Sequence, residues 1–461
     1  MNRAPLQCAG PQSRRSFLEA GLLGLTGLGL GDLLRMRAQA ASSPAASDAS
    51  DTAVILIWLQ GGPSHMETYD LKPEAPVEYR GEMRPIQTKT PGMDLCELLP
   101  QHAALADKFT IIRSISHKFA NHAGGAGRFL SGRDPLRPLE RTSQFPTIGT
   151  IVGRMRENRK VGVPNYVGNQ PNVYGGGAAY LGESALPFVV PGDPNADNFQ
   201  VPNLSLAPQL RDRLDDRLAL LSAFDQMRSR RELAASGSEM DKFNQQAMNL
   251  LTSDKARDAF DMSQEDPRTR ERYGRHRWGQ RALLARRLVE AGVSFVTMQM
   301  QNPGLPGTIG NWDIHAVNGH LFDDTRSRLP VFDQAVSALI EDVHARGLDK
   351  KVMVIVSGEF GRSPRINPQK GTRSGVMQPG RDHWPGAMSV LVSGGGLRMG
   401  QVIGSTTAKG EYAKDDKLDP NDLLATVYRF LGIDYSYAFR DHAGRPLPIL
   451  PYGQPIQQLI G

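Results

Sequence analysis

Short runs of consecutive apolar residues alternate with long polar stretches along this chain. Continuous apolar runs of this length are typical of strands buried on both faces of a sheet, since a half-exposed strand would alternate apolar and polar residues. We expect such strands over residues 53–59, 109–112, 293–298, 352–356 and 388–392.

Other segments have helical spacing. Apolar positions three and four apart predict helices over residues 95–106, 329–345 and 423–431, the last preceded by the capping sequence Asp419-Pro420-Asn421-Asp422. Residues 210–288 are mostly helical in pattern and heavily charged, which indicates a helical layer or cap with a solvated face. Strands that alternate with helices predict an α/β fold with a mostly parallel central sheet.

Acids and histidines follow the predicted strands directly. In open α/β sheets, ligands bind beyond the carboxyl ends of the strands, so side chains gathered there are candidates for a site. These residues are Ser64, His65 and Glu67 after the first strand, His117 and His122 after the second, Asp313 and His315 after the third, and Glu359, Asp382 and His383 after the fourth.

A metal site built from these residues would contain no cysteine. Cys8 lies near the N-terminus, and Cys96 is the other cysteine of the chain. Imidazole and carboxylate are the remaining ligands for zinc, manganese or iron. Asp313 and His315 are two residues apart, which puts both on one side of an extended segment, and His383 could complete the ligand set.

Two further acids could serve this site, and a simpler interpretation competes with it. Glu359 could bridge to the metal or accept a proton, and Asp382 could orient the neighbouring histidine. A metal held there would produce hydroxide near neutral pH or polarise a phosphoryl or sulfuryl oxygen. The alternative for each residue taken alone is an ordinary hydrogen-bonded side chain in a loop.

Length and charge narrow the possible functions. The 461 residues suffice for a large core, and the mean hydropathy of -0.38 indicates a soluble globular chain. Of the formal charge of +6, residues 1–40 supply +3, from five arginines against Glu19 and Asp32. The remaining +3 is too small to favour nucleic-acid binding.

The N-terminus has the pattern of an export signal. Arg14-Arg15 is followed by a mildly apolar segment over residues 20–30 and a small-residue site at Ala38-Gln39-Ala40. We predict a twin-arginine signal over residues 1–40, a disordered linker over 41–52, the twin-arginine translocase as a partner during export, and a periplasmic or cell-envelope location. The apolar segment is too short to span a membrane, and no membrane span is expected after signal cleavage.

The motifs GGPSH, YDLKP, SGRDP, WDIH, GEFGRSP and GRDHWP together resemble an exported bacterial family, the domain of unknown function 1501, over nearly the full length. Residues 383–394 and 422–433 also resemble the last part of the alkaline phosphatase superfamily, which includes the sulfatases. This resemblance implies an alkaline-phosphatase-like three-layer sandwich over residues 53–461, with a loop-rich and helical insertion or cap over 136–290. It aligns Asp313, His315 and His383 with metal ligands.

The chain departs from that superfamily at three positions. Gln60 stands where the first strand of the superfamily ends in a ligand aspartate, and Glu359-Phe360 replaces an Asp-His pair. The nucleophile position falls on His122, which could be a nucleophile, a general acid or an extra ligand. A second metal site would need Glu67 or Asp70 as a substitute ligand.

These features lead to two functional hypotheses. The first is an exported metal-dependent hydrolase of phosphate or sulfate esters that uses zinc, manganese or calcium and acts on a small-molecule or glycan anionic ester. Asp313, His315, His383 and Glu359 would bind the metal, and His122 and Glu359 would be catalytic. The substrate anion would be bound by Arg113, Arg128 and Arg362. The second is a non-catalytic envelope protein that keeps the fold and binds an anionic glycan or a protein partner.

Overall fold

The computed structural model describes residues 51–159, 162–201 and 253–460, and these residues form one unit around an eight-stranded sheet. The predicted signal and almost all of the predicted linker lie outside the described residues. The strand order is β14-β4-β13-β8-β1-β7-β5-β6. In chain order these strands are β1 (Ala53–Trp58), β4 (Phe109–Ile115), β5 (Tyr166–Gly168), β6 (Phe188–Val189), β7 (Phe295–Gln299), β8 (Val352–Ser357), β13 (Met388–Gly394) and β14 (Gln401–Ile403).

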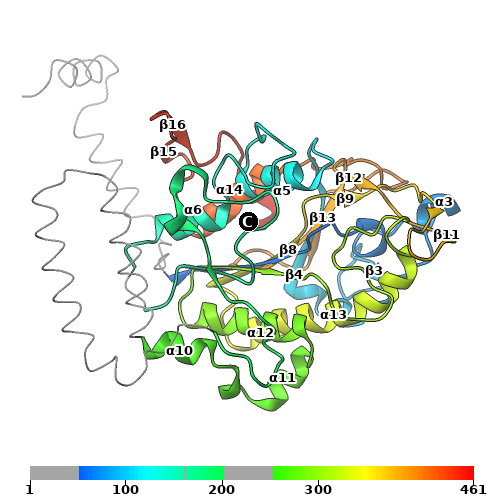
Figure 1. Ribbon diagram of the computed structural model, residues 1–461. Helices are drawn as coiled ribbons and strands as arrows, with labels where there is room; N and C mark the ends of the chain where they lie inside the picture. Colours follow the sequence, from blue (N-terminus) through cyan, green and yellow to red (C-terminus); the bar gives the residue numbers. More distant parts are fainter. Residues whose placement is uncertain (1–50, 160–161, 202–252, 461) are drawn as a thin grey trace, which may run out of the picture. The chain divides into compact units, whose positions relative to one another are not determined.

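Helices cover both faces of this sheet, and three layers result (Figure 1). One face is covered by α4 (Pro100–Ala104), α10 (Asp254–Phe260), α11 (Pro267–Tyr273), α12 (Arg277–Glu290) and α13 (Leu321–Ala345). The other face is covered by α5 (His122–Ser131), α6 (Ile148–Met155) and α14 (Pro420–Phe430). The three-layer α/β architecture that the sequence predicted is therefore confirmed.

Smaller elements decorate the edges of these layers. Two-stranded pairs are formed by β2 (Pro85–Ile86) with β3 (Leu95–Cys96), β9 (Gly361–Arg362) with β12 (His383–Trp384), β10 (Gln369–Lys370) with β11 (Met377–Gln378), and β15 (Ala438–Arg440) with β16 (Pro446–Pro448). Two short helices are α3 (Val77–Arg80) and α15 (Gln457–Ile460). Single 3-10 turns are His65–Glu67, Ala106–Lys108, Ala179–Leu181, Glu183–Ala185 and Met262–Gln264.

The direction of the strands decides where the site can form. Seven strands of the sheet run parallel to one another, and β13 alone runs antiparallel to its neighbours β4 and β8. The carboxyl ends of β1, β4, β7 and β8 therefore lie at one edge, and the beginning of β13 lies at the same edge. Side chains that follow four strands and side chains that precede a fifth are thus brought together.

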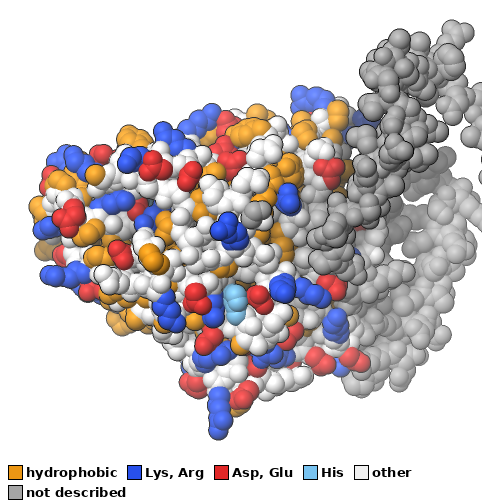
Figure 2. All heavy atoms as spheres, turned by 180° about the vertical axis from the view of Figure 1, so that it is seen from behind, with side chains coloured by type: hydrophobic (Ala, Val, Ile, Leu, Met, Phe, Trp, Pro, Cys, Tyr) orange, Lys and Arg blue, Asp and Glu red, His pale blue; other side chains and the backbone are white. Residues whose placement is uncertain are grey.

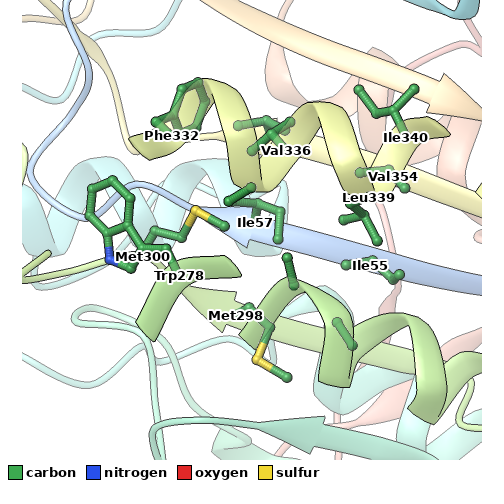
Figure 3. Packing of buried hydrophobic residues seen from close by; sticks show 14 of the residues in the cluster. Ile55, Ile57, Trp278, Met298, Met300, Phe332, Val336, Leu339, Ile340 and Val354 are labelled. Carbon is green, nitrogen blue, oxygen red and sulfur yellow. The ribbon is translucent and has the colours of Figure 1, made fainter. Parts of the chain in front are cut away.

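Alternate strand residues pack into the two cores. Ile55 and Ile57 of β1 point to the face covered by α12 and α13, whereas Val54 and Leu56 point to the opposite face. Figure 3 shows Ile55 and Ile57 beside Phe332, Val336 and Leu339 of α13, with Trp278 of α12 nearby. Complete burial of one such aliphatic side chain stabilises the fold by about 1.5–3 kcal/mol.

The expected helices agree with the structure less closely than the strands do. The helix predicted over residues 95–106 is confirmed only over α4, Pro100–Ala104, and its first part is wrong because Leu95 and Cys96 form β3. Proline lacks the amide hydrogen that a helix interior requires, so it begins this helix. α13 starts eight residues before the predicted Leu329, and Pro330 is accommodated inside it on an exposed position.

The segment assigned to an insertion or cap over residues 136–290 contributes to the central layers. It supplies β5 and β6 to the sheet, α6 to one face, and α10, α11 and α12 to the other. Residues 202–252 of this segment lie outside the described residues.

Two further observations concern the charged surface and the apolar character of the helices. Figure 2 shows one face of the protein, on which Lys and Arg side chains are interspersed with Asp and Glu side chains. Among the described residues, no helix combines the length and the apolar character that crossing a bilayer requires.

Candidate metal centre

Four separate parts of the chain meet at the carboxyl edge of the sheet. β1 ends at the turn Gln60-Gly61, β8 ends just before Glu359, and the long connection after β7 brings in Asp313. His122 begins α5, whose N-cap Asn121 accepts a hydrogen bond from the Gly124 amide at 2.7 Å. These elements place side chains that are far apart in the sequence beside one another.

Backbone contacts hold the Asp313 segment against the end of β1. The Trp312 amide donates to the Gln60 carbonyl at 2.8 Å. Gly61 has a φ of +112°, and a Cβ atom at this position would lie 2.4 Å from the Asp313 amide nitrogen. Only glycine tolerates both this conformation and this approach. The Gly61 turn therefore positions Asp313.

His383 is positioned by the short pairing of β9 with β12. In this antiparallel pair His383 lies opposite Arg362, and Trp384 lies opposite Gly361. Close packing continues at Gly380, where a Cβ atom would lie 1.9 Å from the Ala316 amide nitrogen. The loop that leads to His383 is therefore seated directly on the backbone that follows His315.

Asp313 is the centre of the cluster, because three imidazoles face its carboxylate. Nε2 of His315 and Nε2 of His383 each lie 2.9 Å from Asp313 Oδ1, and Nε2 of His122 lies 3.3 Å from Oδ2. The Nε2 atoms of His315 and His383 are only 3.0 Å apart. The structure thus brings together Asp313, His315 and His383, the three metal ligands expected from the sequence, with His122, which the sequence left as a nucleophile, a general acid or an extra ligand.

The other nitrogen of each imidazole contacts a hydrogen-bond acceptor. Nδ1 of His122 lies 2.7 Å from Glu359 Oε1, and Nδ1 of His315 lies 2.9 Å from Asp382 Oδ1. Nδ1 of His383 lies 2.7 Å from the Ala120 carbonyl. Acceptors at Nδ1 favour the tautomer protonated there, so Nε2 is the nitrogen that faces Asp313, either with an added proton or as a ligand of a bound cation.

These contacts shift the pKa values of the cluster. Burial would raise the pKa of Asp313, but hydrogen bonds from His122, His315 and His383 and the charge of Arg362 hold it far below its usual range. Burial would lower the pKa of His122, whereas its hydrogen bonds to Asp313 and Glu359 raise that pKa to about 9. The hydrogen bond to Asp313 also raises the pKa of His315.

The donor set fits a divalent metal ion. Lone pairs of neutral imidazoles that converge on a carboxylate repel one another unless a cation or added protons lie between them. Within the described residues, His122, Asp313 and His383 each offer a ligand atom, and these atoms lie within 4.8 Å of one another. Their side chains are 24%, 17% and 21% exposed, so the cluster is accessible from solvent.

Glu359 fixes the orientation of His122 from the interior side of the cluster. It is fully buried, and its Oε1 accepts hydrogen bonds from Gln60 Nε2 at 2.9 Å and the Gly61 amide at 2.8 Å in addition to His122. Oε2 has no partner within the described part of the chain. The backbone is also fixed, because His117 Nε2 lies 2.7 Å from the Glu359 carbonyl oxygen.

Arg362, a predicted anion ligand, lies beside Asp313 in the interior. It is 1% exposed, and its Nη2 donates to Asp313 Oδ1 at 2.5 Å. Its remaining donors reach the carbonyl oxygens of Gly61, Gly62 and Arg381, with a further bond to Trp312. Arg362 therefore orients Asp313 and ties together the turns that surround it.

The other two predicted anion ligands make their contacts elsewhere. Arg113 donates to the carbonyl oxygens of Tyr69 and Asp94 and lies 3.5 Å from Asp70. Arg128 is 3% exposed and pairs with Asp419 at 2.8 Å. The structure does not join either side chain to the His122–Asp313–His383 group.

Glu67 and Asp70, considered as ligands of a second metal, are committed to ion pairs. Glu67 pairs with the fully buried Arg381, with 2.6 Å between Oε1 and Nη2. Asp70 pairs with Lys72 at 2.8 Å and also accepts from Thr406. Both carboxylates are therefore neutralised by the chain itself.

Sequence reasoning missed three supporting contributions to the cluster. These are the Gln60 amide on Glu359, the Ala120 carbonyl on His383 and the His117 imidazole on the Glu359 backbone. Burial lowers the pKa of His117 to about 4, which keeps it neutral as a donor. The position of Gln60 just after β1 could have indicated its contact with the site. The contact of the Ala120 backbone carbonyl leaves no signal in the sequence.

The comparisons with known proteins identify a family and a set of distant structures. A family model described as "Protein of unknown function (DUF1501)" matches residues 51–460. No curated protein matches the sequence.

Among solved structures, a sulfatase from Pseudoalteromonas sp. is similar at 10% identity and a TM-score of 0.35, over 83% of this chain and 68% of that one. The lipoteichoic acid synthase LtaP from Listeria monocytogenes is similar at 10% identity and a TM-score of 0.36, over 89% of this chain and 77% of that one. The alkaline phosphatase from the Antarctic bacterium TAB5 is similar at 9% identity and a TM-score of 0.35, over 83% of this chain and 98% of that one.

Proposed function

The chain belongs to DUF1501, a family of proteins of unknown function, and from that starting point we propose that it is a metal-dependent hydrolase of phosphate or sulfate esters. One observation carries the proposal. Three histidines have Nδ1 fixed by an acceptor while Nε2 faces the same carboxylate, Asp313. Histidines that ligate a metal are commonly held in this manner.

His122, Asp313 and His383 would hold the ion, with His315 in reach of the same carboxylate. Such imidazole-rich sites suit zinc or iron better than calcium, which prefers oxygen ligands alone. A divalent ion bound there would supply a water molecule of lowered pKa and polarise an ester oxygen. Glu359 fixes the orientation of His122, and Arg362 fixes that of Asp313.

The ester class comes from the sequence resemblance to the alkaline phosphatase superfamily. The chemistry also suits it, because negative charge develops on the leaving oxygen as the ester bond breaks, and a metal ion or other fixed positive charge stabilises it. An anionic ester, either a small molecule or a glycan, is the proposed substrate.

A specific observation supports a second candidate, a non-catalytic protein that binds an anionic glycan or a protein partner. Both ring nitrogens of His122, the residue at the nucleophile position, contact carboxylates. His122 therefore resembles a ligand or a structural residue more closely than a free nucleophile. Metal retention without ester hydrolysis would favour this candidate.

The metal content of the purified protein tests the proposal. We expect one equivalent of metal by mass spectrometry and its loss in His383→Ala. His442→Ala, which removes an exposed histidine of the C-terminal segment, is the matched control and is expected to keep the metal. Absence of metal from the wild type after reconstitution with zinc, manganese, calcium and iron would overturn the hydrolase proposal.

We also propose that the protein reaches the periplasm or cell envelope by the twin-arginine route. The support is the Arg14-Arg15 pattern and the apolar segment after it. Replacing both arginines with lysine is expected to retain the protein in the cytoplasm, as measured by cell fractionation. Unchanged export of the double variant would contradict this route.

A further inference from the structure

A glycine-rich loop, residues 174–177, lies against the first turn of α5, next to the candidate metal centre. Gly175 has a φ of +84°, and a Cβ atom there would lie 2.4 Å from the Ala123 carbonyl oxygen. The Gly175 amide donates to the Arg141 carbonyl at 2.8 Å, and the Ser143 amide donates to the Gly176 carbonyl at 3.1 Å. The loop and residues 141–143 are thus held together beside His122.

Tyr174 projects from this loop toward the centre. Its ring meets the His122 ring edge-on, with 6.5 Å between the centroids and an interplanar angle of 87°. His122 is in turn 4.3 Å from His383 between ring centroids. Because Tyr174 is 39% exposed, it presents an aromatic surface beside the metal-binding side chains.

Arg141 completes this surface. Its guanidinium carbon lies 5.6 Å from the centroid of the Tyr174 ring, a cation–π contact that restrains an otherwise flexible side chain. Arg141 is exposed, and no ion pair of its side chain occurs within the described ranges. Its positive charge is therefore available to a ligand.

Three other arginines of the described residues are already paired. Arg137 bonds Glu140 at 3.0 Å, Arg128 bonds Asp419 at 2.8 Å, and Arg362 bonds Asp313 at 2.5 Å. Arg128 and Arg362 also face aromatic rings, but Arg141 differs from all three because no ion pair or hydrogen bond of its guanidinium occurs among the described residues. A guanidinium with free donors suits bidentate pairing with phosphate, sulfate or carboxylate.

We propose that Arg141, oriented by Tyr174, binds a second anionic group of the substrate while the ester group lies at the His122–Asp313–His383 cluster. This inference rests on the proposed function and narrows it to esters that carry an additional negative charge. The Tyr174 ring contacts both His122 and Arg141, so the uncharged part of the substrate would lie against this ring and join the two anionic groups.

The test uses ligands that cannot be hydrolysed. Binding of benzene-1,3-disulfonate and of benzenesulfonate to the metal-loaded, full-length protein is measured by calorimetry at equal ionic strength. The wild type is expected to prefer the disulfonate by about 3–10-fold, the magnitude of one partly exposed charged contact. Arg141→Gln is expected to abolish the preference, and Tyr174→Ala to reduce it.

Arg137→Gln is the matched control, since it removes an exposed arginine that is paired with Glu140. This variant is expected to keep the preference. Equal binding of both ligands by the wild type, no binding of either, or an unchanged preference in Arg141→Gln would each overturn the inference. A preference lost in Arg141→Gln, in a protein that hydrolyses no ester, would support the inference and refute the hydrolase proposal.

Discussion

Substitution of Glu359 with glutamine tests whether this buried carboxylate holds His122 as a metal ligand. Glutamine keeps the size of the side chain, and its amide oxygen can still accept from His122, Gly61 and Gln60. The amide group would replace Oε2, the oxygen without a partner among the described residues. The change therefore removes the negative charge with little change of shape.

The magnitude follows from the contact of 2.7 Å between Glu359 Oε1 and His122 Nδ1. Loss of a carboxylate that supports a ligating histidine weakens metal binding by about 10–100-fold, or about 1.4–2.7 kcal/mol. Asp382→Asn likewise removes the carboxylate that contacts Nδ1 of His315. Nε2 of His315 and the Arg362 guanidinium both contact Asp313 Oδ1. We expect the smaller effect there, because the side chain of Asp382 is 45% exposed and solvent screens it.

Zinc affinity is measured by competition with a chromophoric chelator, and thermal unfolding of the metal-free variants establishes that both fold. An affinity of Glu359→Gln within twofold of the wild type would refute the reasoning. A larger loss in Asp382→Asn than in Glu359→Gln would instead identify His315 as the principal ligand.

Three further predictions concern the supporting structure. Glu67→Gln leaves the buried Arg381 without its carboxylate, so urea unfolding should show a loss of about 3–5 kcal/mol, and an unchanged midpoint would contradict this. Burial raises the pKa of Cys96 to about 12, so in a Cys8→Ser background alkylation of the native thiol should be about 1000-fold slower than in denaturant, and equally rapid labelling would be inconsistent with burial. Gly380→Ala should lower the free energy of unfolding by at least about 1–3 kcal/mol in the same urea assay, because the added Cβ would collide with the Ala316 backbone, and it should also lower the metal content. Wild-type stability of this variant would show that the contact is relaxed in solution.

The strands and the edge that holds the site could be predicted because buried parallel strands require continuous apolar runs. That pattern located β1, β7 and β8 to within a few residues. Chain direction then placed Asp313 and Glu359 at one edge. Helix boundaries were less accessible, since the solvated position of Pro330 in α13 depends on packing that spacing does not reveal.

The partners of the arginines could not be predicted. The sequence predicted Arg128 and Arg362 as anion ligands. In the structure both are buried, and Arg128 pairs with Asp419 whereas Arg362 pairs with Asp313. Which arginine keeps its charge free depends on contacts between distant loops, as the stacking of Arg141 on Tyr174 illustrates. Spacing within one segment carries no information on such contacts.

The cluster is assembled from residues that are widely separated along the chain, and this separation sets the order of events during synthesis. The bond between Gln60 and Glu359 joins residues 299 positions apart, and that between His122 and Glu359 joins residues 237 apart. Loops of this size close late in folding. A nascent chain that ends before His383 would lack one of the proposed ligands. If the cluster holds an ion as proposed, only the nearly completed chain would acquire it, and under the proposed export route loading would take place in the cytoplasm before translocation.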